Sequence, residues 1–327
     1  MITRRCLISG AASATVLGLP GLAVAQQGFP NKQVKIIVPF PPAGPTDLMG
    51  RLVADRLKEK WGQPVVAENR PGASGSIGAA AVLQAPADGY TLCLSNNAAN
   101  GAYELLNPKG APYVTLRDFA PVALIGFSQL VAVINPKIPA NNLKEFIAYV
   151  KANPGKVNYA SSAIGSSPHL ACELLNTTAG ISMTHIPFNG AAPALLSVAS
   201  GDTQIYMGGY STVQAMVADK SVRMISAFSG QRIAAVPDLM TAKEEGFNGL
   251  EWDSWFGVLA SSKVPAPILD KINADINEML GGEEMRKKLE GYGMNRKLSS
   301  RGEFETLIKH EYERTGQVIK QANIKVE

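Results

Sequence analysis

The sequence has few cysteines, few histidines and few charged residues for its length. Its 327 residues include three cysteines and three histidines, and 18% of the residues are acidic or basic. Because no cysteines or histidines occur at the spacing of metal ligands, we expect neither a metal ion nor another cofactor. Cys93 and Cys172 lie in apolar segments and are expected to be small buried residues, although a disulfide between them stays open.

The chain also lacks a basic stripe and, beyond its first 25 residues, a long apolar run. A formal net charge of +4 without a basic cluster argues against a nucleic-acid partner. No later segment offers about 18 consecutive apolar residues, so we do not expect the mature chain to be embedded in a membrane. The hydrophobic fraction of 46% is instead typical of a globular protein with a sizeable core.

The first 25 residues differ from the rest of the chain. Arg4 and Arg5 precede an apolar run of small residues, and that run is followed by Ala23-Val24-Ala25. This pattern predicts a signal peptide at residues 1–25 that is cleaved on export to the periplasm, rather than a membrane anchor. Residues 3–8 also resemble a twin-arginine motif, so the general secretory route and the twin-arginine route both stay open.

After the signal, short β-branched runs alternate with Gly- and Pro-rich loops and amphipathic helices. This order predicts an α/β fold with parallel strands, and the length predicts two lobes. Apolar segments at residues 127–129 and 252–259 are where the chain could cross between the lobes, close to a hinge. We therefore expect lobe 1 at residues 26–127 plus 253–327, lobe 2 at residues 128–252, and a ligand cleft between them.

The individual strands and the C-terminal part are predicted more coarsely. From residue 267 onward the pattern predicts helices that pack back on lobe 1, with a short strand at residues 294–298. Ten earlier strands are expected, at residues 34–40, 64–68, 91–95, 122–126, 130–134, 157–160, 183–188, 204–207, 222–228 and 255–260.

Four loops follow predicted strands and precede predicted helices, which is where open α/β sheets bind ligands. They cover residues 39–47, 70–78, 161–167 and 188–192, and they are rich in Gly, Ala, Pro and Ser. Free N–H groups at a helix start can bind a carboxylate or phosphate without an arginine. The predicted ligand-binding residues are Phe40, Ala43, Gly44, Thr46, Asp47, Ser74, Gly75, Ser76, Asn96, Ser161, Ser162, Ser166, Phe188, Asn189, Gly190, Ala192 and Tyr210.

Ordered blocks along the mature chain resemble the tripartite tricarboxylate transporter receptors, also called the Bug family. The resemblance implies a type II periplasmic-binding-protein fold, in which two loops of lobe 1 grip a ligand carboxylate and lobe 2 tunes specificity. The blocks include Val38-Pro39-Phe40 with Gly44, Thr46 and Asp47, Asn69-Arg70-Pro71-Gly72-Ala73, Ala87-Asp88-Gly89-Tyr90-Thr91-Leu92, Tyr159-Ala160-Ser161-Ser162, His185-Ile186-Pro187-Phe188 and Trp255-Phe256-Gly257.

Some residues depart from the family pattern. Ala43, Ser74 and Ala163 stand where the family usually has Gly, and Ser76 stands where it usually has Asn. These departures leave the identity of the carboxylate open: a mono-, di- or aromatic carboxylic acid. The implied partners are the membrane subunits of a tripartite tricarboxylate transporter or a sensor protein, and we expect the receptor itself to be a monomer.

A hydrolase is the alternative that the sequence leaves to be tested. Ser166 and His169 lie about one helical turn apart and form the best candidate for a nucleophile and its base. No Gly-x-Ser-x-Gly elbow is present, and a helix-capping serine beside a packed histidine explains the spacing equally simply. We therefore expect a receptor without catalytic residues.

Overall fold

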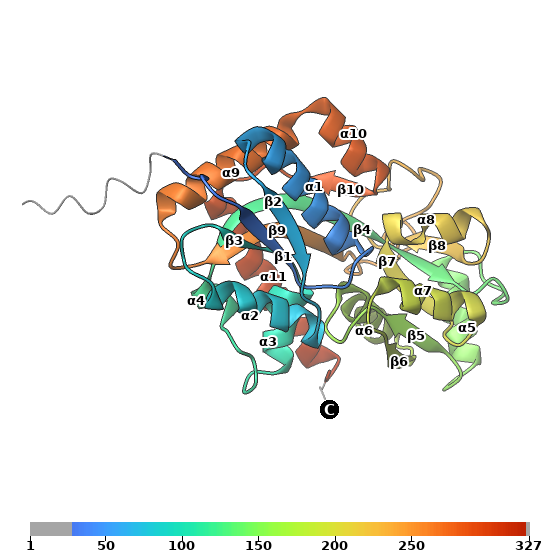
Figure 1. Ribbon diagram of the computed structural model, residues 1–327. Coiled ribbons are helices and arrows are strands. Elements are labelled where there is room, and N and C mark those ends of the chain that lie inside the picture. Colours follow the sequence, from blue (N-terminus) through green and yellow to red (C-terminus); the bar gives the residue numbers. More distant parts are fainter. Residues whose placement is uncertain (1–27, 325–327) are drawn as a thin grey trace, which may run out of the picture.

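Two connected sheets form the centre of the molecule, which is described by a computed structural model for residues 28–324 (Figure 1). The predicted signal peptide lies outside these described residues. In the first sheet, β1 pairs in parallel with β2 and β3, and β9 pairs antiparallel with β3 and β4. Its strands are β1 (Val34–Val38), β2 (Val65–Asn69), β3 (Thr91–Asn96), β4 (Phe119–Ile134), β9 (Asp253–Ser261) and β10 (Met294–Arg296).

The second sheet is built on the other end of β4. There β4 pairs antiparallel with β7 and β8, while β5 pairs in parallel with β6 and β7. The predicted parallel order therefore holds within each lobe but not for the strands that connect the lobes. The further strands of this sheet are β5 (Asn158–Ser161), β6 (Thr184–Pro187), β7 (Ile205–Gly209) and β8 (Arg223–Ala227).

A single strand, β4, replaces the two strands predicted at residues 122–126 and 130–134, so that part of the prediction was wrong. The intervening residues stay extended because they pair with the start of β9: Phe127 opposite Trp255, Ser128 opposite Ser254 and Gln129 opposite Asp253. The chain thus passes between the lobes on two hydrogen-bonded strands rather than through loops.

Helices cover both sheets and give each lobe its own core. Helix α1 buries Leu52 and Leu57 against the first sheet, and helix α5 buries Phe146 and Val150 against the second. The longer helices are α1 (Pro45–Trp61), α2 (Ser76–Gln84), α5 (Leu143–Ala152), α6 (Ser167–Ala179), α7 (Ala191–Ser200), α8 (Tyr210–Ala218), α9 (Ala266–Gly281), α10 (Glu283–Gly291) and α11 (Arg301–Gln321), and the short ones are α3 (Tyr103–Leu106) and α4 (Thr115–Asp118).

Helix α11 contacts both lobes. Phe304 and Ile308 pack in the core of lobe 1, as expected for the C-terminal part. Val318, in addition, packs in the core of lobe 2, a contact that the sequence pattern did not predict. A helix of 21 residues is about 31 Å long and can therefore reach from one core to the other.

Both cysteines of the described part are buried and free, so no disulfide joins them. Burial raises the pKa of the Cys93 thiol to about 12. The interpretation of Cys93 and Cys172 as small buried residues is therefore confirmed. Between residues 28 and 324, no helix is both long enough and apolar enough to cross a membrane.

Candidate functional site

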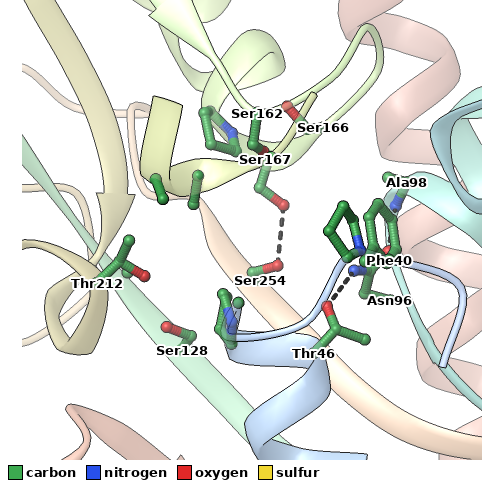
Figure 2. Close-up of a pocket in the computed structure, with 18 of the residues that line it drawn as sticks. Phe40, Thr46, Asn96, Ala98, Ser128, Ser162, Ser166, Ser167, Thr212 and Ser254 are labelled. Atoms are coloured by element: carbon green, nitrogen blue, oxygen red, sulfur yellow. Dashed lines mark hydrogen bonds between the residues drawn. The ribbon is translucent and has the colours of Figure 1, made fainter. Parts of the chain in front are cut away.

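A cavity of about 130 Å³ lies where the two sheets meet, between the lobes (Figure 2). Loops that follow β1, β5 and β6 contribute to it, together with the ends of β3 and β7 and the paired strands β4 and β9. Of the described residues that line the cavity, none carries a charged side chain or an imidazole. Its polar groups are hydroxyls, side-chain amides and backbone groups, among apolar residues such as Phe40 and Phe256.

Four helices begin at this cavity. The N-cap residues are Gly44 for α1, Ser166 for α6, Gly190 for α7 and Gly209 for α8, and all four line the cavity. None of these N-caps is closed by a side-chain hydrogen bond, in contrast to Asn142 at the start of α5. The first N–H groups of a helix have no partner inside it, so these helix starts turn hydrogen-bond donors and positive dipole ends toward the cavity.

The first predicted loop is held in place by Asp47, which does not itself line the cavity. Its buried carboxylate accepts hydrogen bonds from Ala43 N at 3.0 Å, Arg51 Nε at 3.0 Å and Asn69 Nδ2 at 2.8 Å. Burial alone would raise the pKa of Asp47, but the hydrogen bonds from Arg51, Asn69 and Ala43 outweigh it and lower the pKa. Asp47 therefore fixes the shape of the loop that presents Phe40 to the cavity.

The second predicted loop, at residues 70–78, lies behind Phe40 and does not line the cavity. A Cβ added to Gly75 would lie 2.8 Å from Ala99 Cβ and 3.1 Å from Phe40 Cζ, so Gly75 supports the aromatic ring from behind. Ser74 Oγ donates to Ile164 O at 2.8 Å and so joins the lobes, while Ser76 is buried at the start of α2. This loop acts on the cavity through Phe40.

In the third predicted loop, the hydroxyls of Ser161 and Ser166 bond within the protein. Ser161 Oγ lies 2.6 Å from His185 Nε2, and Ser166 Oγ donates to Ala163 O at 2.7 Å. His169 Nδ1 accepts the N–H of Gly165 at 2.9 Å. The hydrolase alternative requires a hydrogen bond between the Ser166 hydroxyl and the His169 ring. In this structure, each of these side chains is hydrogen-bonded to a backbone group instead.

Phe188 and Tyr210 also lie outside the cavity lining, packed against the apolar core between β7, α7 and α8. Seven of the predicted residues are therefore placed nearby but not on the cavity surface. The structure brings the other ten together around the cavity: Phe40, Ala43, Gly44, Thr46, Asn96, Ser162, Ser166, Asn189, Gly190 and Ala192.

Several residues that line the cavity were not predicted. Ser128 and Ser254 lie on the paired crossing strands, and Thr212 lies in the first turn of α8. Ser167 Oγ donates to Ser254 Oγ at 3.0 Å, which connects the two lobes across the cavity (Figure 2). The sequence feature that could have identified Ser128 as a cavity residue was the predicted crossing between the lobes at residues 127–129. However, only the pairing of β4 with β9 places Ser128 beside the cavity.

No group of three or more His, Cys, Asp or Glu side chains within residues 28–324 is arranged to hold a metal ion. The uncharged lining and the four helix starts instead suit an anion that accepts hydrogen bonds. Chemically, the arrangement can bind such a group. Ser161 Oγ, which lies 2.6 Å from His185 Nε2, is not part of the cavity lining.

The chain is similar to known proteins both in sequence and in structure. The sequence model for the tripartite tricarboxylate transporter family receptor matches residues 49–324. Protein BugT of Bordetella pertussis is 33% identical over 303 residues, which cover 93% of this chain and 93% of BugT. Two solved structures from Rhodopseudomonas palustris are each 30% identical: Rpa4515 with adipate (TM-score 0.88; 91% of this chain, 99% of that one) and MatC (Rpa3494) with bound malate (TM-score 0.82; 89% and 100%).

Proposed function

Because this chain belongs to the tripartite tricarboxylate transporter receptor family, we propose that its interlobe cavity binds a small carboxylate. The resemblance noted in the sequence is thereby confirmed, and so is the two-lobed α/β fold of a periplasmic binding protein. The observation that carries the proposal is the meeting of four helix N-termini without side-chain caps in a cavity lined by uncharged residues.

Electrostatics favour an anion in this cavity. Each helix N-terminus acts as roughly half a positive charge, and its N–H groups donate hydrogen bonds that a carboxylate accepts well. A cation would face partial charges of its own sign, and a fully apolar ligand would leave the hydroxyls and N–H groups without partners. The relatives with adipate and with malate support the same class of ligand.

We further propose that the receptor is exported by the signal at residues 1–25, by the general secretory or the twin-arginine route. It would act as a monomer with lobe 1 at residues 26–127 plus 253–327 and lobe 2 at residues 128–252. Closure would bend the paired strands β4 and β9 near residues 127–129 and 252–255. The receptor would deliver its ligand to membrane subunits of a tripartite tricarboxylate transporter, or report it to a sensor protein.

A thermal-shift screen of the purified protein against a panel of carboxylic acids tests the ligand class. An acid at 100 times its dissociation constant should stabilise the fold by about 2.7 kcal/mol. The amide of the same acid, a sugar and a divalent cation serve as controls. Stabilisation by a sugar or cation but by no acid would contradict the proposal, and ester hydrolysis lost in Ser166→Ala would support the hydrolase instead.

A further inference from the structure

Asn97 is a buried polar residue that lies next to the cavity without lining it. It is 2% exposed and directly follows β3, between Asn96 and Ala98, which both line the cavity. Its Oδ1 accepts the N–H of Trp255 at 2.9 Å, one residue beyond the last pair of β3 with β9. The side chain of Asn97 therefore continues the contact between lobe 1 and β9 where the strand pairing ends.

The N–H of Trp255 fixes the orientation of the Asn97 amide. Because a backbone N–H can only donate, the amide oxygen faces it and the amide nitrogen points elsewhere. Asn97 Nδ2 donates to Glu311 Oε2 at 3.2 Å, and Ser254 Oγ donates to Asn97 Oδ1 at 3.5 Å. Ser254 in turn accepts the hydroxyl of Ser167. A chain of hydrogen bonds thus runs from α6 of lobe 2, past β9, to α11.

Glu311 and Arg314 lie on the part of α11 that passes between the two cores. They are placed between Ile308, in the core of lobe 1, and Val318, in the core of lobe 2. Arg314 Nη1 lies 3.9 Å from Glu311 Oε1, and Arg314 Nη2 donates to the backbone oxygen of Glu251. One helix therefore carries an acidic and a basic group that both reach the chain where it crosses between the lobes.

Arg314 contacts the lobe 2 side of this crossing. Its guanidinium carbon lies 4.5 Å from the centroid of the Trp252 ring, and Trp252 is fully buried in the core of lobe 2. Glu311 contacts the lobe 1 side through Asn97, whose partners are residues 254 and 255. Helix α11 is therefore connected to the crossing segment, residues 251–255, on both sides of the place where closure would bend it.

We propose that Asn97, Glu311 and Arg314 form a hinge cluster that holds the crossing segment in the arrangement seen here and so sets how tightly the receptor binds any ligand. None of the three residues lines the cavity. This inference rests on the proposed function, in which a ligand binds between the lobes and closure bends β9 near these residues. Weakening the cluster lowers the population of the binding-competent arrangement, and the apparent affinity falls with it.

The variant Asn97→Asp tests the cluster with almost no change of shape. The new carboxylate still accepts the N–H of Trp255, but it turns an oxygen instead of a donor toward Glu311. Dissociation constants of the purified protein are measured by calorimetry for a panel of carboxylic acids at pH 8, where the new carboxyl group is ionised. They should rise about tenfold, because a charge-assisted hydrogen bond is replaced by repulsion.

The pattern across the panel separates a positioning role from a contact with the ligand. A residue that acts through closure changes the affinity for every acid by the same factor, whereas a residue that touches the ligand changes the ranking of the acids. Arg314→Met keeps a side chain of similar length without its donors and its charge. It should therefore also weaken all acids alike, and it carries the same test if Asn97→Asp does not fold.

Exchanging the two partners should restore the hydrogen bond with its direction reversed. When Asn97→Asp is combined with Glu311→Gln, the new amide donates to the new carboxylate, so the dissociation constants should return to within about twofold of the wild-type values. Glu313→Gln, at an exposed position on the same helix, is the matched control and should not rescue Asn97→Asp.

Each outcome decides for or against the hinge cluster. Unchanged affinities, an altered ranking of the acids, or a failure of Glu311→Gln to rescue more than Glu313→Gln would overturn it. If no acid binds to the wild type, the proposed function itself fails, and hydrogen exchange of residues 251–255 in the ligand-free proteins decides the cluster alone. Exchange there should be faster in Asn97→Asp than in the wild type and slower again with Glu311→Gln, and equal exchange in all three would overturn the cluster.

Discussion

The imidazole rings of His169 and His185 stack on each other, with centroids 3.9 Å apart and 9° between their planes. His169 accepts the N–H of Gly165, and His185 contacts the hydroxyl of Ser161. These two bonds fix both ends of the loop that carries Ser162 to the cavity. Two neutral histidines therefore hold a ligand loop, although neither one lines the cavity.

This pair predicts a loss of stability in acid. Burial lowers the pKa of His169 to about 3, with a smaller contribution from His185, and burial lowers the pKa of His185 to about 4. Both values lie below the usual 6.5, so the unfolded chain binds more protons. The contribution of the two neutral histidines to the free energy of unfolding should be complete above about pH 6.5. As the pH falls below that value, the free energy of unfolding should decrease by up to about 1.4 kcal/mol per pH unit for each histidine, and by less for the partly exposed His185.

Denaturant titrations between pH 7.5 and pH 4.5 check this expectation. Burial raises the pKa of Asp253 to about 7, which acts in the opposite direction, so the wild type is compared with His169→Gln rather than judged alone. The variant should show a shallower pH dependence, and His310→Gln, at an exposed position on α11, should not. Equal slopes for all three proteins would contradict the assignment.

Replacing Asp47 by Asn should destabilise the protein. The change removes the charge that pairs with Arg51 at 3.0 Å and leaves buried donors with a weaker acceptor, so we expect a loss of about 1–3 kcal/mol. The pKa of Asp47 is lowered in the fold, so its contribution is present above about pH 4 and is lost as the pH falls below that. Asp55→Asn, on the exposed side of α1, should change the unfolding free energy by less than about 0.5 kcal/mol in the same titration.

Gly75→Ala should weaken both the fold and ligand binding. Gly75 has φ +95°, which L-residues rarely adopt, and the new Cβ would press on Ala99 and Phe40. We expect a stability loss of about 1–3 kcal/mol and a higher dissociation constant, because Phe40 lines the cavity. Gly302→Ala, at an open position in α11, serves as the control and should be neutral or stabilising. An unchanged dissociation constant would show that the loop behind Phe40 does not act on the site.

The hydrogen bond between Ser167 and Ser254 should stabilise the closed arrangement of the lobes. A double-mutant cycle of Ser167→Ala and Ser254→Ala, measured by denaturant unfolding, should give a coupling energy of about 0.5–1.5 kcal/mol. The single variants should also bind ligand more weakly, since part of the binding energy must then restore closure. A coupling energy of zero would mean that the contact does not hold the lobes together.

Local sequence patterns predicted most of the strands and ten of the cavity residues, because strand ends and glycine-rich helix starts are encoded by neighbouring residues. Gly190 and Ser166 are examples: each lies in a loop that follows a strand, and each begins a helix. The predicted spacing could not show that the ring of Phe40 stands between Gly75 and the cavity, because that depends on how two loops pack.

Ser128 and Ser254 illustrate the other limit of local patterns. Each lies inside a strand between one aromatic and one polar residue, so the local sequence does not distinguish it from an exposed strand position. Only the long-range pairing of β4 with β9 turns both residues toward the cavity. The same pairing explains why residues 119–134 form one strand where two were predicted.

The continuity of β4 also affects how the protein unfolds and where a protease can cut it. One strand belongs to both sheets and helix α11 contributes to both cores, so each lobe completes its hydrophobic core with elements that it shares with the other lobe. No exposed connecting segment separates them at β4, which leaves a protease no linker to cut there. We therefore expect the unit of folding to be larger than one lobe, so that neither lobe folds when it is expressed alone.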